Sequence, residues 1–146
     1  MRLDRLDLTR YGRFTESTLS FAAPPAGGAD LHIVYGPNEA GKSTLFSAWL
    51  DLLFGIPTRT RYDFRHSGPT MQVGALLSHA GSTLEVKRLK RNSASLLDRH
   101  DAALPEAALQ STLGGLSRDG YSAMFSLDDE TLEKSGAGIL ASRGDL

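Results

Sequence analysis

One glycine-rich stretch, at residues 36–43, constrains this chain more than any other part of its sequence. It reads GPNEAGKS and matches the pattern G-x-x-x-x-G-K-[ST], which is typical of a loop that binds nucleotide phosphates. The apolar, β-branched run at residues 31–35 precedes it and predicts a buried central strand. The run TLFSAWLDLLF at residues 44–54 follows it and predicts a nearly buried helix that ends at Gly55. A strand, a glycine-rich loop and a helix in this order predict an α/β fold of the P-loop NTPase class.

The chemistry of phosphate binding explains the fixed positions of this motif. Gly36 lets the chain turn sharply, and Gly41 lets backbone N–H groups approach phosphate oxygens with no Cβ in between. The ammonium of Lys42 can reach the β- and γ-phosphates, and the hydroxyl of Ser43 can bind Mg²⁺, which prefers oxygen ligands. The N-terminus of the following helix also favours negative charge. The residues expected to bind the nucleotide are Gly36, Pro37, Asn38, Glu39, Ala40, Gly41, Lys42, Ser43 and Thr44.

Composition limits the class of protein to which the chain can belong. The chain has 146 residues, the size of one domain, and its net charge of −1 argues against a dedicated basic nucleic-acid module. It has no cysteine, which excludes disulfide scaffolds and thiolate zinc sites, and its histidines do not lie at metal-ligand spacing. It has neither an apolar run long enough for a membrane helix nor an apolar signal peptide. We therefore expect a cytoplasmic protein that does not associate with membranes.

Further strands and helices are expected on both sides of the motif. Alternating apolar residues predict strands at residues 2–8, 17–21, 71–77 and 83–89, and weaker patterns predict helices at residues 105–113, 117–124 and 128–133. Residues 22–30 contain prolines and glycines and predict a surface loop. The chain stops without a closing helix or a polar tail, which suggests a piece of a larger protein.

Two basic groups lie outside the motif. Lys87, Arg88, Lys90 and Arg91 fall on a predicted hairpin, where we favour a solvated strand face over contact with DNA. A polar loop carries Arg59, Arg61 and Arg65 together with Tyr62 and Phe64. Arginines interleaved with aromatics suit nucleic-acid binding, and they suit equally an exposed loop that two aromatic side chains anchor.

Several further segments point to a known family. They are LDLTRYGRF near the start, LHIVYGPNEAGKSTLF, the stretch from LLFGIP to YDFRH, VKRLKRNSASLLD, and YSAMFSLDDETLEKSGAGIL. With these segments the chain resembles the N-terminal part of YhaN-like ATPases, a branch of the SbcC/RecF/SMC group of ABC-type heads. Asn38 strengthens the resemblance, because proteins of this group commonly carry asparagine at this position of the loop.

The resemblance implies a fold and a mechanism. Residues 1–146 would form the N-terminal ATP-binding lobe of an ABC-type head, with mixed or antiparallel strands around a P-loop strand and helix. A coiled coil would follow, and a C-terminal lobe of the same ATPase would supply the signature and the catalytic glutamate. Two heads would form an ATP-dependent homodimer, with a nuclease similar to SbcD and DNA as further partners in DNA repair or DNA metabolism. ATP and Mg²⁺ would be the ligands, and the lobe alone would bind ATP but hydrolyse it poorly.

The resemblance also raises two questions about individual residues. ABC-type heads carry a glutamine that senses Mg²⁺ near the end of this lobe, and here Leu127 and Asp128 take that place. Asp128 is therefore a candidate for contact with Mg²⁺ or water. Arg13 is a second candidate for nucleotide binding, because the early bend in these heads approaches the nucleotide.

Three further expectations complete the sequence analysis. Without a second lobe, the predicted strand at residues 31–35 has an open edge, which predicts marginal stability or self-association. A complete small P-loop kinase is one alternative function, in which the loop with Arg59 and Arg65 would contact a phosphoryl acceptor. A non-enzymatic module whose dimerisation is gated by a nucleotide is the other alternative.

Overall fold

A computed structural model of the chain describes residues 1–125, which contain a five-stranded antiparallel sheet. The strands are β1 (Arg2–Tyr11), β2 (Phe14–Ser20), β3 (Gln72–His79), β4 (Ser82–Leu89) and β5 (Leu96–Asp98), in the spatial order β2-β1-β3-β4-β5. The helices are α1 (Lys42–Phe54), a 3₁₀ turn (Gly68–Thr70), α2 (Ala107–Gln110) and α3 (Arg118–Phe125). The sheet, α1 and α2 belong to one compact unit, Met1–Gly114, and α3 belongs to a second unit that begins at Gly115.

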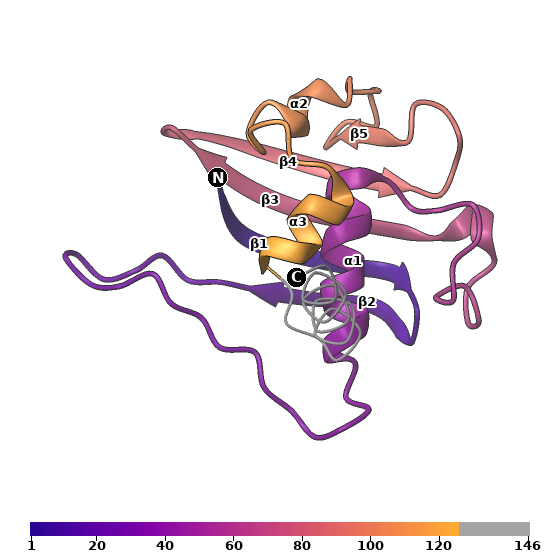
Figure 1. Cartoon of the computed structure of the whole chain (residues 1–146), viewed down its shortest axis with the longest axis horizontal. Helices are drawn as coiled ribbons and strands as arrows, with labels where there is room; N and C mark the ends of the chain where they lie inside the picture. The colour runs from indigo at the N-terminus through magenta and orange to yellow at the C-terminus, as the bar shows by residue number, and fades with distance from the viewer. Residues whose placement is uncertain (126–146) are drawn as a thin grey trace, which may run out of the picture. The chain divides into compact units, whose positions relative to one another are not determined.

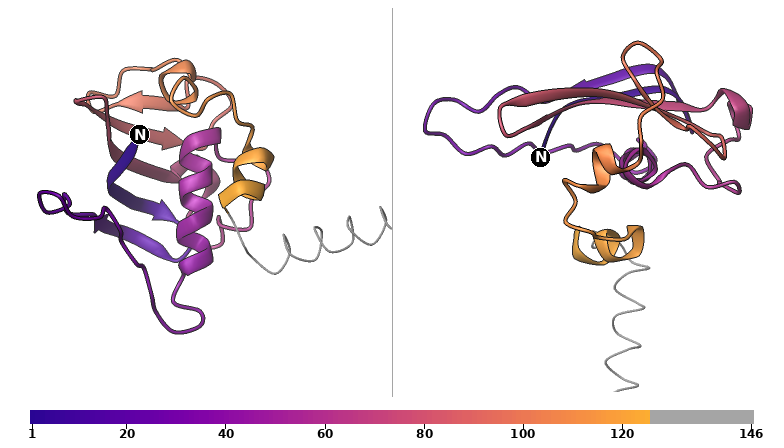
Figure 2. Two further views of the ribbon diagram at one scale, coloured as in Figure 1. Left: turned by 60° about the vertical axis from the view of Figure 1, so that its left-hand side comes forward. Right: turned by 90° about the horizontal axis from the view of Figure 1, so that it is seen from above.

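The core lies between one face of the sheet and α1 (Figures 1 and 2). Leu6 of β1 is paired with Ala75 of β3, and both side chains are buried in this core together with Leu52 of α1. The pairing of β1 with β3 shifts in register between Asp7 and Arg10, as at a β-bulge. Such a shift changes the face to which later side chains point, and it accounts for the burial of both Leu8 and Tyr11.

Helix α1 lies on one side of the sheet (Figure 2). The face of the sheet that points away from α1 is polar. Arg5 forms an ion pair with Asp7 of its own strand, with Nε and Oδ2 at 2.9 Å, and a second ion pair with Glu85 of β4. Lys87 of β4 pairs with Asp101 on the same face. A sheet with one apolar and one charged face is the usual antiparallel arrangement, and it follows the predicted alternation.

The prediction of a buried central strand at residues 31–35 is wrong. These residues form neither strand nor helix, and the exposed fractions are 74% for Leu31, 75% for Ile33 and 90% for Tyr35. β-branched and aromatic residues favour an extended backbone, but an extended segment becomes a strand only when another strand pairs with it. None of the described strands pairs with residues 31–35, so the expected P-loop strand at the centre of the sheet is not observed.

Most other predicted elements are confirmed. Helix α1 ends where expected, with the N–H of Gly55 donating to the carbonyl of Asp51. The hairpin predicted from residues 71–77 and 83–89 is β3–β4, and the helix predicted at residues 117–124 is α3. The helix predicted at residues 105–113 is shorter, because only Ala107–Gln110 forms α2.

Two predictions fall outside the described residues, namely the helix at residues 128–133 and the proposed role of Asp128. None of the helices within residues 1–125 is both long and apolar enough to cross a membrane.

The prediction of a solvated strand face is wrong for Arg88, which is fully buried. Consecutive side chains of a strand point to opposite faces, so Lys87 lies on the polar face while Arg88 points toward the core. The Nε of Arg88 donates to the carbonyl of Leu52 at 3.0 Å, and the guanidinium pairs with Glu106. Arg88 is therefore a structural residue of the core and cannot contribute to a surface that binds DNA.

Candidate functional site

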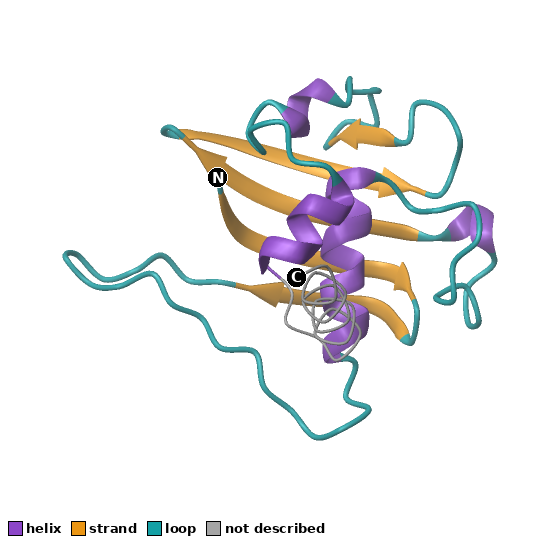
Figure 3. Cartoon of the chain, viewed as in Figure 1, coloured by secondary structure: helices purple, strands orange, loops and turns teal. Residues whose placement is uncertain are grey.

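The glycine-rich stretch consists of turns and bends that lead into the N-terminal end of α1 (Figure 3). Gly41, the residue before α1, has a φ of 104°, and Glu39 has a φ of 65°. The N–H of Ala40 donates to the carbonyl of Pro37 at 3.2 Å, and the first helical bond runs from Leu45 N to Gly41 O at 2.8 Å. No side chain caps this end of α1, so the N–H groups of its first turn have no side-chain acceptor there.

Lys42 folds back over the loop that precedes it. Its Nζ donates to the carbonyl of Gly36 at 2.7 Å and to the carbonyl of Pro37 at 2.8 Å. The residue is exposed to solvent, as is the neighbouring Ser43 in the first turn of α1. The ammonium is therefore exposed beside the loop, where an anion can compete with the two carbonyls for its hydrogen bonds.

The turn between β1 and β2 packs directly against this loop. A Cβ built on Gly41 would lie 2.6 Å from Cζ of Phe14 and 3.3 Å from Cδ of Arg13. A Cβ built on Gly12 would lie 2.7 Å from Cγ2 of Thr44. Glycine at both positions therefore permits a close approach between two segments that are far apart in the sequence.

The structure brings Arg13, a nucleotide-binding candidate, to the glycine-rich loop. Its guanidinium donates to the carbonyl of Glu39. Residues 36–44 and Arg13 thus lie together, and they surround the N-terminal end of α1 with the positive charges of Lys42 and Arg13. The helix dipole has the same sign at this end, so the site favours an anion.

The loop that carries Arg59, Arg61 and Arg65 lies beside the same turn. Tyr62 anchors it, because its hydroxyl lies 2.7 Å from Oγ of Ser47 on α1 and its carbonyl accepts from Gly12 N at 2.9 Å. His66 donates from Nε2 to the carbonyl of Phe14 at 2.8 Å, which strengthens the attachment. The expected anchoring by two aromatics holds for Tyr62 only, because Phe64 is 70% exposed.

A buried polar contact between Tyr11 and Asp51 joins β1 to α1. The hydroxyl of Tyr11 donates to Oδ2 of Asp51 at 2.5 Å, and Asp51 is almost completely buried. Ser47 and Asp51 lie four positions apart on an otherwise apolar helix, so they share one face of it, but the sequence does not identify their partners. Two polar residues four positions apart in such a helix were the available signal, since a buried carboxylate needs hydrogen-bond donors.

Within residues 1–125, no group of three or more His, Cys, Asp or Glu side chains is arranged to hold a metal ion. The exposed hydroxyl of Ser43 at the start of α1 fits the predicted Mg²⁺ ligand, because Mg²⁺ in nucleotide sites takes few protein ligands and several from phosphates and water.

The domain has an α/β architecture, and the sequence pattern of its glycine-rich loop, at the start of an uncapped helix, is the pattern of P-loop NTPases. The family model described as "AAA domain" matches residues 1–146, and the chain belongs to this family of ATPase-type, nucleotide-binding domains. The chain is also 28% identical over 130 residues to a protein named "Uncharacterized protein YhaN" from Bacillus subtilis (strain 168). The match covers 88% of the chain and 13% of YhaN, so the chain spans a small part of its relative's length. These findings confirm the expected resemblance to YhaN-like ATPases.

Proposed function

We propose that residues 36–44 bind the phosphates of ATP, and that the chain is the N-terminal ATP-binding lobe of an SMC/SbcC-like ATPase. One observation carries the proposal: Gly41, with its φ of 104°, joins the loop to an α1 that no side chain caps. This junction directs the N–H groups of the first helical turn toward the loop, where phosphate oxygens can accept from them. The family membership supports ATP as the nucleotide.

The side chains around the loop have distinct roles in this proposal. Lys42 exchanges its bonds to the carbonyls of Gly36 and Pro37 for phosphate oxygens, because a hydrogen bond between ions is stronger than one to a neutral carbonyl. Arg13 stays bonded to Glu39 O and adds positive charge at the side of the loop. Ser43 would hold Mg²⁺, which neutralises phosphate charge.

The proposal extends to the longer protein of which the lobe would be a part. A C-terminal lobe would supply the signature and the catalytic glutamate, and two heads would dimerise around ATP in the cytoplasm. DNA and a nuclease similar to SbcD would be the further partners, and Asp128 would contact Mg²⁺ or water. The apolar residues exposed at positions 31–35 support a missing neighbour, because such residues are usually covered in a complete protein.

Binding and turnover of Mg²⁺·ATP by the chain test the proposal. We expect the wild-type chain to bind, Lys42→Ala to lose most of the affinity, and Lys87→Ala on the distant polar face to retain it. Turnover should be high only when the chain is mixed with a C-terminal lobe. Undiminished affinity in Lys42→Ala would contradict the assignment of the loop.

The same measurements separate the proposal from its alternatives. Phosphate transfer to an added metabolite, with no second lobe present, would favour a small kinase. Dimerisation of the chain on a non-hydrolysable ATP analogue, with no turnover in any mixture, would favour a nucleotide-gated module.

A further inference from the structure

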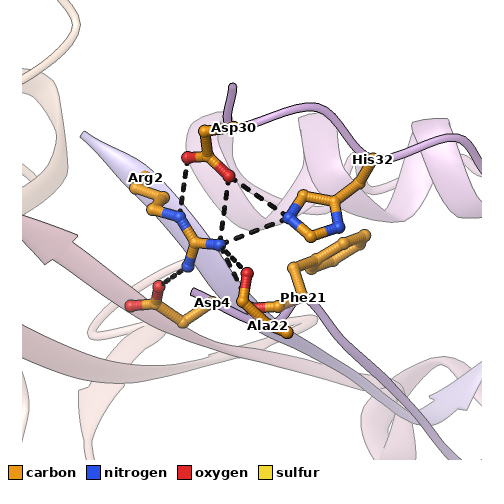
Figure 4. A network of polar contacts seen from close by, with 6 residues as sticks. All are labelled: Arg2, Asp4, Phe21, Ala22, Asp30 and His32. Carbon is orange, nitrogen blue, oxygen red and sulfur yellow. Dashed lines mark hydrogen bonds and ion pairs between the residues drawn. The ribbon is translucent and has the colours of Figure 1, made fainter. Parts of the chain in front are cut away.

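The guanidinium of Arg2, at the start of β1, contacts three segments of the chain (Figure 4). Its Nε donates to Oδ2 of Asp30 at 2.8 Å, and Nη2 donates to Oδ1 of Asp30 at 3.2 Å, which makes a bidentate pair. The same Nη2 donates to the carbonyls of Phe21 and Ala22, which follow β2. It also lies 3.3 Å from Nε2 of His32.

These contacts attach the segment that enters the glycine-rich loop. His32 lies 3.2 Å from Oδ1 of Asp30, and its ring packs against Phe21 with the centroids 5.3 Å apart. Within the described part of the chain, the hydrogen bonds and ion pairs that join residues 29–35 to the sheet all pass through Asp30 and His32. The loop before this segment, residues 22–28, is exposed, and within it the N–H of Gly28 donates to the carbonyl of Pro25.

The glycine-rich loop is therefore held at both ends by different contacts. At its exit it continues into α1, and Lys42 and Arg13 bond to its carbonyls. At its entrance only residues 33–35 separate the attached His32 from Gly36. Without the attachment, the whole stretch from the end of β2 to Gly36 would have to be ordered when a ligand binds, and this ordering costs affinity.

We infer that Arg2 and Asp30 are positioning residues for the phosphate-binding loop, because their ion pair fixes residues 30–35 and keeps the loop in its binding conformation. The inference rests on the proposed function, and it concerns residues outside the nucleotide motif. The hydrogen bond from Arg2 lowers the pKa of the Asp30 carboxyl from its ordinary value, because the guanidinium stabilises the carboxylate.

Asp30→Asn tests the inference, with Asp4→Asn as a matched control. Both variants remove one carboxylate that pairs with Arg2, but Asp4 belongs to β1 itself, whereas Asp30 belongs to the attached segment. Backbone ¹⁵N relaxation at residues 31–36 of the full chain reports the order of the segment, and titration with Mg²⁺·ATP reports affinity. Both variants keep the core intact, so a thermal melt should change little.

For Asp30→Asn we expect order parameters at residues 31–36 to fall below about 0.6. We also expect affinity to fall about tenfold, as when a tenth of the molecules remain competent to bind. Asp4→Asn should change neither. Unchanged order in Asp30→Asn, or equal effects in both variants, would overturn the inference.

The outcomes also separate this inference from the proposed function. If Asp30→Asn loosens the segment while its affinity for Mg²⁺·ATP stays that of the wild type, the positioning role fails and the proposed function stands. If the wild-type chain binds no nucleotide, the proposed function fails together with the positioning role, although the relaxation data still report whether the ion pair orders the segment.

Discussion

Arg88 and Glu106 form an ion pair in which the guanidinium is fully buried, with Nη2 2.9 Å from Oε2. Arg88 also donates from Nε to the carbonyl of Leu52, in the last turn of α1, and from Nη1 to Oγ of Ser95 at 2.8 Å. One side chain of β4 therefore connects the end of α1 with the segments before β5 and α2. A cation is favourable at this end of a helix, where carbonyl groups lack helical partners.

Replacing Arg88 by alanine should lower the free energy of unfolding by about 1–3 kcal/mol, because it leaves the carbonyl of the buried Leu52 without its donor. Urea unfolding followed by the fluorescence of Trp49, the single tryptophan, measures the change. Lys87→Ala, on the opposite face of the same strand, should cost no more than about 1 kcal/mol. Equal effects in the two variants would show that Arg88 is not a core residue.

Replacing Gly41 by alanine should distort the glycine-rich loop. The added Cβ would meet the ring of Phe14 at 2.6 Å, and the φ of 104° is unfavourable for any residue with a Cβ. We expect the affinity for ATP to fall about tenfold or more, because a small displacement of the loop moves its binding groups out of position. Gly27→Ala is the control, because Gly27 also has a positive φ, of 73°, but no atom lies within 4 Å of the added Cβ. Normal affinity in Gly41→Ala would contradict the close packing of the turn on the loop.

Removing the hydroxyl of Tyr11 should destabilise the packing of β1 against α1, which the bond from Tyr11 to Asp51 supports. Tyr11→Phe removes a donor that lies 2.5 Å from the buried carboxyl group of Asp51, and removing one partner of a buried hydrogen bond costs about 1–3 kcal/mol. Thermal or urea unfolding measures the loss. Tyr35→Phe removes a hydroxyl from a residue that is 90% exposed, so its stability should match the wild type. A stable Tyr11→Phe would show that this bond does not stabilise the fold.

The carboxyl group of Asp98 should titrate below its ordinary pKa. The N–H of Ala102 and, less strongly, the N–H of His100 donate to its Oδ1 at 2.9 and 2.8 Å, and they lower its pKa from 3.8. Because the folded pKa lies below the unfolded one, these bonds stabilise the turn above pH 3.8 and are lost as the pH falls through the folded pKa. The carboxyl ¹³C shift of Asp98 measures the midpoint, and the chain unfolded in urea is the control. A folded midpoint at or above the urea value would contradict the two bonds.

Local sequence patterns predicted much of the fold correctly. The apolar run of α1, Gly55 after it, and the alternation that forms β3 and β4 depend on interactions between residues close in the chain. Local sequence also identified the candidate site, because one short motif defines a glycine-rich loop before a helix.

The burial of Arg88 and the exposure of residues 31–35 could not be predicted in this way. Arg88 lies in a run of basic residues that favours a solvated surface, and only the strand's alternation together with Glu106 and the end of α1 makes a buried position stable. Residues 31–35 have the composition of a central strand, but pairing requires a neighbouring strand that local sequence does not specify.

By itself, then, the sequence determined the helix, the hairpin and the glycine-rich motif, because each is specified by a pattern within one short stretch of the chain. The tertiary structure alone decided which distant residues meet: Arg13 of the β1–β2 turn at the carbonyl of Glu39, Tyr62 of the arginine loop at Ser47 of α1, and Arg2 of β1 at Asp30. These meetings depend on how the sheet and α1 pack, since side chains far apart in the chain come together only when the core that joins them has formed.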